Sequence, residues 1–307
     1  MRRYLRLLMW LFILPAAGPA GAASFDCTKA DTAVEETICD DPALSKADER
    51  LAEAYASALT VTLAPGALQA EQSQWLRQRN KLVGAGPLQL AYKARIAELT
   101  ETADKWRKVP REIAAESAAK TCVLPPDPPD GSCRLESFGT INEALRYQIQ
   151  AYRDGDLWTA GGVAIFRVAS QHLVPLVLTA VDTAHFDAPG LAQSGHLLVI
   201  PGHLEGTGNF NAGLVYLLGG DGQLREVDTE SWLTELPRRL PKGLGAWKGI
   251  YPDYDTLTAE TPLWKEGDGN CCPTGGRAFI RLDLRNRRLA IVDVRTKLGE
   301  AAAQGEP

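Results

Sequence analysis

The chain has 307 residues, of which 45% are hydrophobic and 23% are charged, and its formal net charge is −5. This length favours two domains, and the ordinary composition allows a sizeable core. Because the chain is mildly acidic and its Lys and Arg residues do not cluster with aromatic residues, nucleic acid is not expected as a partner. Gly-x-Ser-x-Gly, His-Glu-x-x-His and Walker-type motifs are absent from the sequence, so no catalytic residue, metal site or cofactor is predicted.

The first 23 residues have the pattern of a secretory signal peptide. Arg2, Arg3 and Arg6 form a basic start, residues 7–14 are apolar, and residues 20–23 are small. The apolar run is shorter than the roughly 20 residues that a membrane span requires, and no later segment is long and apolar enough. We therefore expect a mature chain without a membrane span, located in the periplasm or secreted.

Helical spacing dominates the next part of the chain, residues 24–108. A short helix is expected between Cys27 and Cys39, because Asp40-Asp41-Pro42 must end it. The next helix opens with Ser45 or Asp41-Pro42 at its first turn, and a third follows Pro65-Gly66. Apolar residues recur at helical spacing in the second helix, namely Leu44, Leu51, Ala54, Tyr55 and Leu59. A fourth helix is expected from Pro87 to about Lys108, with Leu90, Ile96 and Leu99 facing inward.

The segments VEETICDDPALSKAD, QSQWLRQRN and AYKARIAEL occur in this order between Phe25 and Leu99. Together they resemble the N-terminal domain of the lysozyme inhibitor LprI family. The resemblance implies a helical, exported, disulfide-stapled domain that acts by binding protein. The matching positions are Cys27, Cys39, Asp48, Tyr55, Gln72, Trp75, Arg79, Tyr92 and Arg95. Residues 80–87 lack the second cysteine pair that members often carry there, so the resemblance says nothing about the role of that loop.

Export makes the six cysteines candidates for disulfides. Cys27 and Cys39 flank one short helical segment of the LprI-like region, and we expect them to be paired. Two arrangements of Cys122, Cys133, Cys271 and Cys272 stay open. Either Cys122 and Cys133 pair across their turn-rich loop and Cys271–Cys272 form a vicinal bridge, or the two pairs cross. A zinc site is not expected, since no further ligands lie at the right spacing.

After a proline-rich linker, residues 109–132, the pattern changes to alternation. Residues 145–152 alternate apolar and polar positions, as a half-buried strand does. Further strands are expected at residues 162–168, 173–180, 196–200, 213–218, 223–227, 279–284 and 288–294, with one helix at 229–236. The fold class is therefore α+β, in which residues 133–298 form a mainly antiparallel β domain, a meander that curls into a barrel or an open sandwich. Residues 299–307 are expected to be a disordered tail.

The distribution of charged residues near the N-terminus indicates the candidate binding residues. Residues 24–60 contain nine acidic and three basic side chains, nine minus three giving six net negative charges. Glu35, Glu36, Asp40 and Asp41 lie at the centre of this stretch, and a basic protein such as lysozyme would be steered towards them. The predicted function is thus that of an exported, non-enzymatic envelope protein acting by protein–protein binding. The alternative is an envelope hydrolase or a ligand-binding module that uses the Gly- and Asn-rich loops 205–211 and 266–276 of the β domain.

Overall fold

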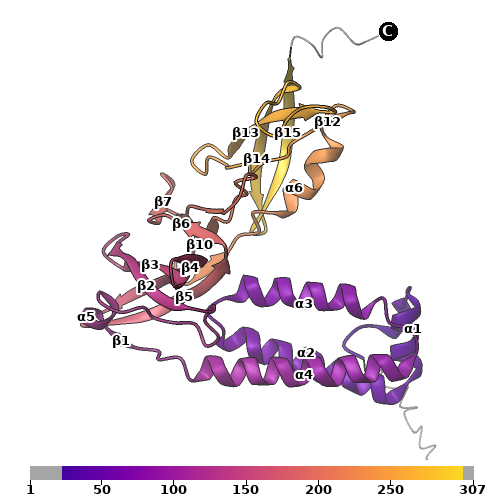
Figure 1. The fold of residues 1–307 in the computed structure, drawn as a ribbon. Helices are drawn as coiled ribbons and strands as arrows, with labels where there is room; N and C mark the ends of the chain where they lie inside the picture. Colours follow the sequence, from indigo (N-terminus) through magenta and orange to yellow (C-terminus); the bar gives the residue numbers. More distant parts are fainter. Residues whose placement is uncertain (1–22, 300–307) are drawn as a thin grey trace, which may run out of the picture. The chain divides into compact units, whose positions relative to one another are not determined.

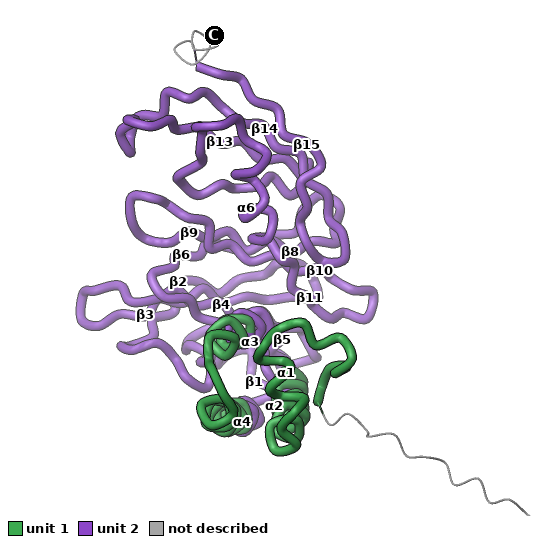
Figure 2. Tube along the Cα trace, turned by 90° about the vertical axis from the view of Figure 1, so that its right-hand side faces the viewer, with its two compact units in different colours: residues 1–60, 73–102 green, residues 61–72, 103–307 purple. Residues whose placement is uncertain are grey.

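The computed structural model describes residues 23–299, so the predicted signal peptide up to residue 22 and the predicted tail from residue 300 lie outside the described part. The described chain forms two compact units (Figure 2). The helical unit comprises residues up to Thr60 together with Ser73–Thr102, and the β-rich unit comprises Val61–Gln72 and the chain from Ala103 onward. The α+β class predicted from the sequence is confirmed.

Helices supply the first part of the chain (Figure 1). In order they are the 3-10 turn η1 (Cys27–Lys29), α1 (Ala33–Asp40), α2 (Pro42–Val61), α3 (Pro65–Arg79) and α4 (Ala85–Arg107). Pro42 and Pro65 each occupy the first position of a helix, where the missing N–H costs nothing. None of the helices in the described residues is long and apolar enough to cross a membrane.

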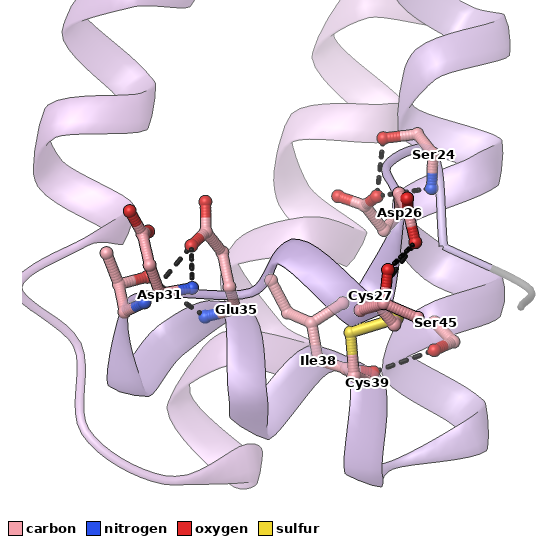
Figure 3. The surroundings of a disulfide bond; sticks show 11 residues. Ser24, Asp26, Cys27, Asp31, Glu35, Ile38, Cys39 and Ser45 are labelled. Carbon is pink, nitrogen blue, oxygen red and sulfur yellow. Dashed lines mark hydrogen bonds between the residues drawn. A yellow bond between two sulfur atoms is a disulfide. The ribbon is translucent and has the colours of Figure 1, made fainter.

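The short helix α1 has well-defined ends. Thr32 and Glu35 form a capping box, since each side chain accepts a hydrogen bond from the backbone N–H of the other residue. At the other end, Asp41 Oδ1 accepts from the N–H groups of Ala43 and Leu44 and so caps α2. Ser45 plays a different part, because its hydroxyl donates to the Ile38 carbonyl at 2.7 Å (Figure 3).

A disulfide joins η1 to the end of α1. Cys27 and Cys39 are bonded, with their Cα atoms 5.8 Å apart (Figure 3), and this confirms the expected pair. Such a bridge removes conformational freedom mainly from the unfolded chain.

The buried side of α4 differs from the prediction at one position. Leu88, Tyr92 and Leu99 are buried, whereas Leu90 is 71% exposed. The expectation that Leu90 faces inward was therefore wrong. The reason is helical geometry: positions 88, 92, 95 and 99 follow the 3.6-residue repeat, and Leu90 lies two residues, about 200°, away from Leu88.

Antiparallel sheets make up most of the β-rich unit. The first sheet has the order β1 (Ile113–Ala114), β5 (His172–Asp182), β4 (Leu157–Ala169), β3 (Leu145–Asp154) and β2 (Ser132–Thr140). The second has β11 (Leu224–Glu226), β10 (Leu214–Leu218), β8 (Leu197–Ile200) and β7 (Gly190–Leu191). The third has β12 (Leu244–Gly245), β13 (Thr258–Lys265), β14 (Gly276–Arg285) and β15 (Arg288–Leu298), while β6 (Ala184–Phe186) pairs with β9 (Gly202–Leu204).

The long strands of this unit follow the predicted meander. Strands β2 to β5 pair consecutively, as do β13 to β15. The turn between β14 and β15 places Asn286 and Arg287 at φ values of 50° and 60°, the geometry of a two-residue hairpin turn. The predicted helix is present as α6 (Ser231–Glu235), followed by η2 (Leu236–Arg238).

Strand β3 is buried on both faces rather than on one. Its polar residues Gln148 and Gln150 have no exposed surface, and Tyr152 is 1% exposed. Residues 118–123 lie against this face and hydrogen-bond to both glutamines. The alternating pattern located the strand correctly, but the expectation of a half-buried strand was wrong.

The other two disulfides fit one of the arrangements that the sequence left open. Cys122 is bonded to Cys133, with a Cα–Cα distance of 6.3 Å, and Cys271 is bonded to Cys272. The first of these anchors the end of the segment that packs on β3. The division of the chain at residues 108 and 133 stays a prediction.

Candidate functional site

The family-like residues of the helical unit gather around one buried carboxylate, that of Asp48 in α2. The Tyr92 hydroxyl donates to Asp48 Oδ1 at 2.7 Å, and Arg79 Nη1 lies 3.9 Å from the same oxygen. Arg79 also donates to the Tyr92 oxygen at 2.9 Å. The second oxygen, Asp48 Oδ2, accepts from the backbone N–H and the hydroxyl of Ser24, at 2.8 and 2.5 Å.

Trp75 and Asn80 complete this Asp48 network. The Trp75 and Tyr92 rings meet edge to face with their centroids 5.3 Å apart, and the Arg79 guanidinium lies 5.9 Å from the Trp75 ring. Asn80 Oδ1 accepts from Arg79 Nε and Nη2. Burial, helped by the hydrogen bond to Asp48, raises the pKa of Tyr92 and keeps its hydroxyl a donor. Asp48, Arg79 and Tyr92 are buried, whereas Ser24 and Asn80 at the edge of the network are exposed. The buried centre of the network therefore holds the helices together.

The remaining family-like positions outside the disulfide are Tyr55, Gln72 and Arg95. Tyr55 is half-buried, and burial raises its pKa although the Arg95 guanidinium opposes the shift. Arg95 itself is buried and pairs with Glu98 at 3.3 Å. Gln72 is buried as well, but it belongs to the β-rich unit.

The four candidate binding acids divide into two pairs. Glu35 and Asp41 cap helices, and the hydrogen bond from the Asp31 N–H holds the pKa of Glu35 below its ordinary value. Glu36 and Asp40 are exposed on α1. Only the second pair is thus available to a partner without loss of a helix cap.

An exposed apolar residue lies close to these acids. Gln89 Nε2 in α4 donates to Asp41 Oδ2 at 3.2 Å, which places the start of α4 beside the junction of α1 and α2. The next residue is Leu90, which is 71% exposed. We call Glu36, Asp40, Asp41 and Leu90 the acidic end of the helical unit. Figure 1 shows that α1 and the start of α4 lie at the same end of the helices.

Glu205, the first residue of loop 205–211, lies beside His185 of strand β6. His185 Nε2 lies 3.0 Å from Glu205 Oε1, and the His185 ring is stacked between Trp158 and His203 at centroid distances of 4.0 and 5.2 Å. A hydrolase would need a nucleophile within hydrogen-bond reach of such a histidine. Between residues 23 and 299, neither His185 nor His203 is hydrogen-bonded to a hydroxyl or a thiol.

Loop 266–276 is organised by Asp268. Its carboxylate accepts from the N–H groups of Lys265 and Thr274, at 2.9 and 2.8 Å, and from the Thr274 hydroxyl at 2.6 Å. These bonds, the Thr274 hydroxyl first, hold the pKa of Asp268 below its ordinary value. The Asp268 carboxylate therefore stabilises the conformation of its own loop. In the described part of the chain, no three His, Cys, Asp or Glu side chains are grouped so as to hold a metal ion.

A groove that the sequence did not indicate lies on the third sheet. It has a volume of about 570 Å³ and its lining includes Tyr251, Phe279, Arg281, Asp293 and Arg295. Phe279 and Tyr251 are 42% and 44% exposed. Alternation along β14 and β15 does predict which residues face outward, but it does not show that a loop 30 residues earlier brings Tyr251 to the same face.

Comparison with known proteins gives a partial match. Residues 26–105 match the family described as "Lysozyme inhibitor LprI". Proteins named "Lipoprotein LprI" from Mycobacterium bovis and from two strains of Mycobacterium tuberculosis are 36% identical over 85 residues, which is 26% of this chain and 43% of theirs. The chain thus matches less than half the length of these relatives.

One solved structure has a weaker likeness. A chain from a structural and mechanistic study of two prolyl endopeptidases is similar over 53% of this chain and 20% of its own, with 15% sequence identity. Its TM-score is 0.27, which is too low to define a common fold. The resemblance inferred from the sequence is confirmed at the N-terminus: the chain carries an LprI-like domain over residues 26–105.

Proposed function

We propose that this protein is an exported binding protein whose helical unit attaches to a basic protein, with lysozyme as the first candidate, in the manner of LprI-type inhibitors. The observation that carries the proposal is the match of residues 26–105 to the lysozyme inhibitor family. The signal-peptide pattern of residues 1–23 and the name lipoprotein given to the relatives support a site of action outside the cytoplasm, periplasmic or secreted.

The acidic end is the surface we assign to this binding. Glu36 and Asp40 give it a negative charge, which accelerates the encounter with a basic partner. Leu90 gives it an exposed apolar side chain, and packed apolar contacts hold a complex after the encounter. The Asp48 network acts indirectly, since it fixes the helices that carry these residues.

The β-rich unit takes no catalytic part in this proposal. The alternative is that the unit binds a small ligand, and the groove beside Tyr251 and Phe279 favours ligand binding over hydrolysis. The His185–Glu205 pair alone does not supply a hydrolytic mechanism, because a nucleophile is also required.

The test is a lysozyme inhibition and binding assay with the chain from Ser24 onward. Three variants are compared with it: Glu36→Gln with Asp40→Asn, Leu90→Ser, and a control pair of exposed acids, Glu136→Gln with Glu143→Gln. Glu35 and Asp41 are left intact, because changing a capping residue costs about 0.5–2 kcal/mol of stability and would confuse the result.

We expect the Glu36/Asp40 variant to bind roughly tenfold more slowly at low salt, with a smaller difference at physiological salt, where the Debye length is about 8 Å. Leu90→Ser is expected to accelerate dissociation roughly fivefold or more at both salt concentrations. The control pair is expected to behave as the unchanged chain. No inhibition by the unchanged chain at either salt concentration would reject the proposed function, whereas inhibition unaffected by all variants would reject only the acidic end as the surface.

A further inference from the structure

The vicinal bridge Cys271–Cys272 lies in the loop between β13 and β14, and both cysteines are exposed. It differs from the other two bridges in its span. Cys27–Cys39 and Cys122–Cys133 are 12 and 11 residues apart in sequence, and their partners are half-buried. Cys271 and Cys272 are adjacent in sequence.

This bridge contributes little to the stability of the fold. A disulfide stabilises a protein mainly by closing a loop in the unfolded chain, and the effect grows with the length of that loop. Neighbouring residues close almost none. The loop is held in place by other means, namely the three hydrogen bonds that the Asp268 carboxylate accepts from Lys265 and Thr274. Loop closure in the unfolded chain therefore does not account for the pair.

Geometry and exposure make this bridge the most open of the three to thiol attack. Protein disulfides usually join Cα atoms about 4.4–6.8 Å apart. The Cys271 and Cys272 Cα atoms are 3.8 Å apart, the spacing of any two neighbours joined by a trans peptide, so their bridge closes a small ring through a single peptide bond, unlike the other two bridges. Constrained or exposed disulfides are the ones that exchange readily with thiols.

A shared hydrogen-bond acceptor lies between this bridge and a buried indole. The Gly269 carbonyl accepts two hydrogen bonds, one from the Cys272 N–H at 3.0 Å and one from Trp264 Nε1 at 3.2 Å. Trp264 is 1% exposed, and its ring stacks with the ring of Trp247, with centroids 5.8 Å apart. Trp247 is 45% exposed. Rearrangement at Cys272 thus reaches Trp264 through one shared carbonyl oxygen.

We propose that Cys271–Cys272 is a thiol–disulfide exchange site whose co-reactant is a dithiol. A thiolate of the dithiol attacks one cysteine sulfur, the Sγ–Sγ bond breaks, and its electron pair leaves on the other sulfur, which takes up a proton. The second thiol of the dithiol then attacks the mixed disulfide and releases the first cysteine as a thiolate, which is protonated in turn. The dithiol becomes a disulfide, and the cysteine pair gains two electrons and two protons.

The test is stepwise reduction of the full chain with dithiothreitol, followed by alkylation with iodoacetamide, peptide mass mapping and tryptophan fluorescence. We expect Cys271 and Cys272 to be alkylated together at roughly tenfold or more lower reductant concentration than the other four cysteines. The fluorescence is expected to change over the same range. The double variant Cys271→Ser with Cys272→Ser should fold, since the Asp268 hydrogen bonds remain, and its fluorescence should not change at those concentrations.

A Trp264→Phe variant assigns the signal, because the early fluorescence change should then be largely lost while early alkylation persists. Simultaneous reduction of all three bridges would overturn the exchange site, as would alkylation of Cys271 and Cys272 without any reductant. Early alkylation with no change in fluorescence would overturn the coupling to Trp264.

Discussion

Each compact unit contains a buried polar network, and the two networks are built from different chemistry. In the helical unit the network is ionic: Asp48 faces Arg79, with Tyr92 between them. In the β-rich unit it is neutral. Gln148 and Gln150 hydrogen-bond to each other at 2.7 Å and to the backbone of residues 118–123, and the Tyr152 hydroxyl donates to Gln150 at 3.1 Å.

The two networks have different structural roles. The ion pair of the helical unit joins side chains of two separate helices, α2 and α3. Because removing either partner leaves an uncompensated buried charge, the pair stabilises the unit only while both residues are present. The glutamines instead hydrogen-bond to backbone groups of residues 118–123, a segment with little regular secondary structure. Their amides satisfy N–H and C=O groups that would pair with a neighbouring strand if the segment were part of a sheet. Burial raises the pKa of Tyr152 to about 12, which keeps its hydroxyl a donor in this neutral network.

Breaking the ionic network is expected to give the largest effect. Asp48→Ala leaves the Arg79 guanidinium buried without its carboxylate, and removing one partner of a buried pair costs about 3–5 kcal/mol. Hydrogen-exchange mass spectrometry checks this, since it measures opening of α2 and α4 separately from the β-rich unit. Tyr92→Phe serves as the matched control, because it removes a hydroxyl and keeps the charges, at a cost of about 1–3 kcal/mol. Equal protection of α2 in Asp48→Ala and the unchanged chain would contradict the importance of the pair.

The sequence predicted the ionic network only as a set of positions. Asp48, Trp75, Arg79 and Tyr92 were identified through the order and spacing of the LprI-like segments, and no residue pattern indicated that they meet. Their contact depends on the packing of three helices, which spacing within one helix does not define. The inward orientation predicted for Leu90 was wrong for a related reason, since the inward side of α4 depends on which helices cover it.

Breaking the neutral network is expected to give a smaller and more local effect. Gln148→Leu removes the acceptor of the Val123 N–H and the donor to the Thr121 carbonyl, and unsatisfied buried groups cost about 1–3 kcal/mol. Faster hydrogen exchange should be confined to residues 118–123 and β3. Gln223→Leu, at an exposed position, is the control. Loss of protection throughout the β-rich unit would mean that the network supports the whole sheet rather than one segment.

The strands of the β-rich unit were predicted better than their surroundings. Alternation located β3, β4, β5, β14 and β15, because a period of two is a local property of the chain. It missed β13, although Thr258–Lys265 pairs along most of its length with β14. It also read Gln148 and Gln150 as solvent-facing, since no local signal shows that a segment 25 residues earlier covers them.

A half-buried carboxylate in the β-rich unit, that of Glu226, provides a third case and the smallest expected effect. Glu226 in β11 accepts a hydrogen bond from the Gly66 N–H at 2.9 Å, and no ion pair involves it among the described residues. Burial raises its pKa above the ordinary value of 4.5, and the Gly66 N–H only partly opposes this shift. Asp48, in contrast, has a cation beside it.

The sign of the pH dependence follows from that raised pKa. The folded chain holds the Glu226 proton to a higher pH than the unfolded chain does, so the contribution to stability is full below about pH 4.5 and is lost as the pH rises through the raised pKa. Glu226→Gln keeps an acceptor for the Gly66 N–H and removes the titration. Urea unfolding of the β-rich unit from pH 4 to pH 7 should therefore show the unchanged chain losing stability relative to this variant as the pH rises. The exposed Glu136→Gln should not alter the profile, and parallel profiles for Glu226→Gln and the unchanged chain would show that the carboxylate is ionised at no cost.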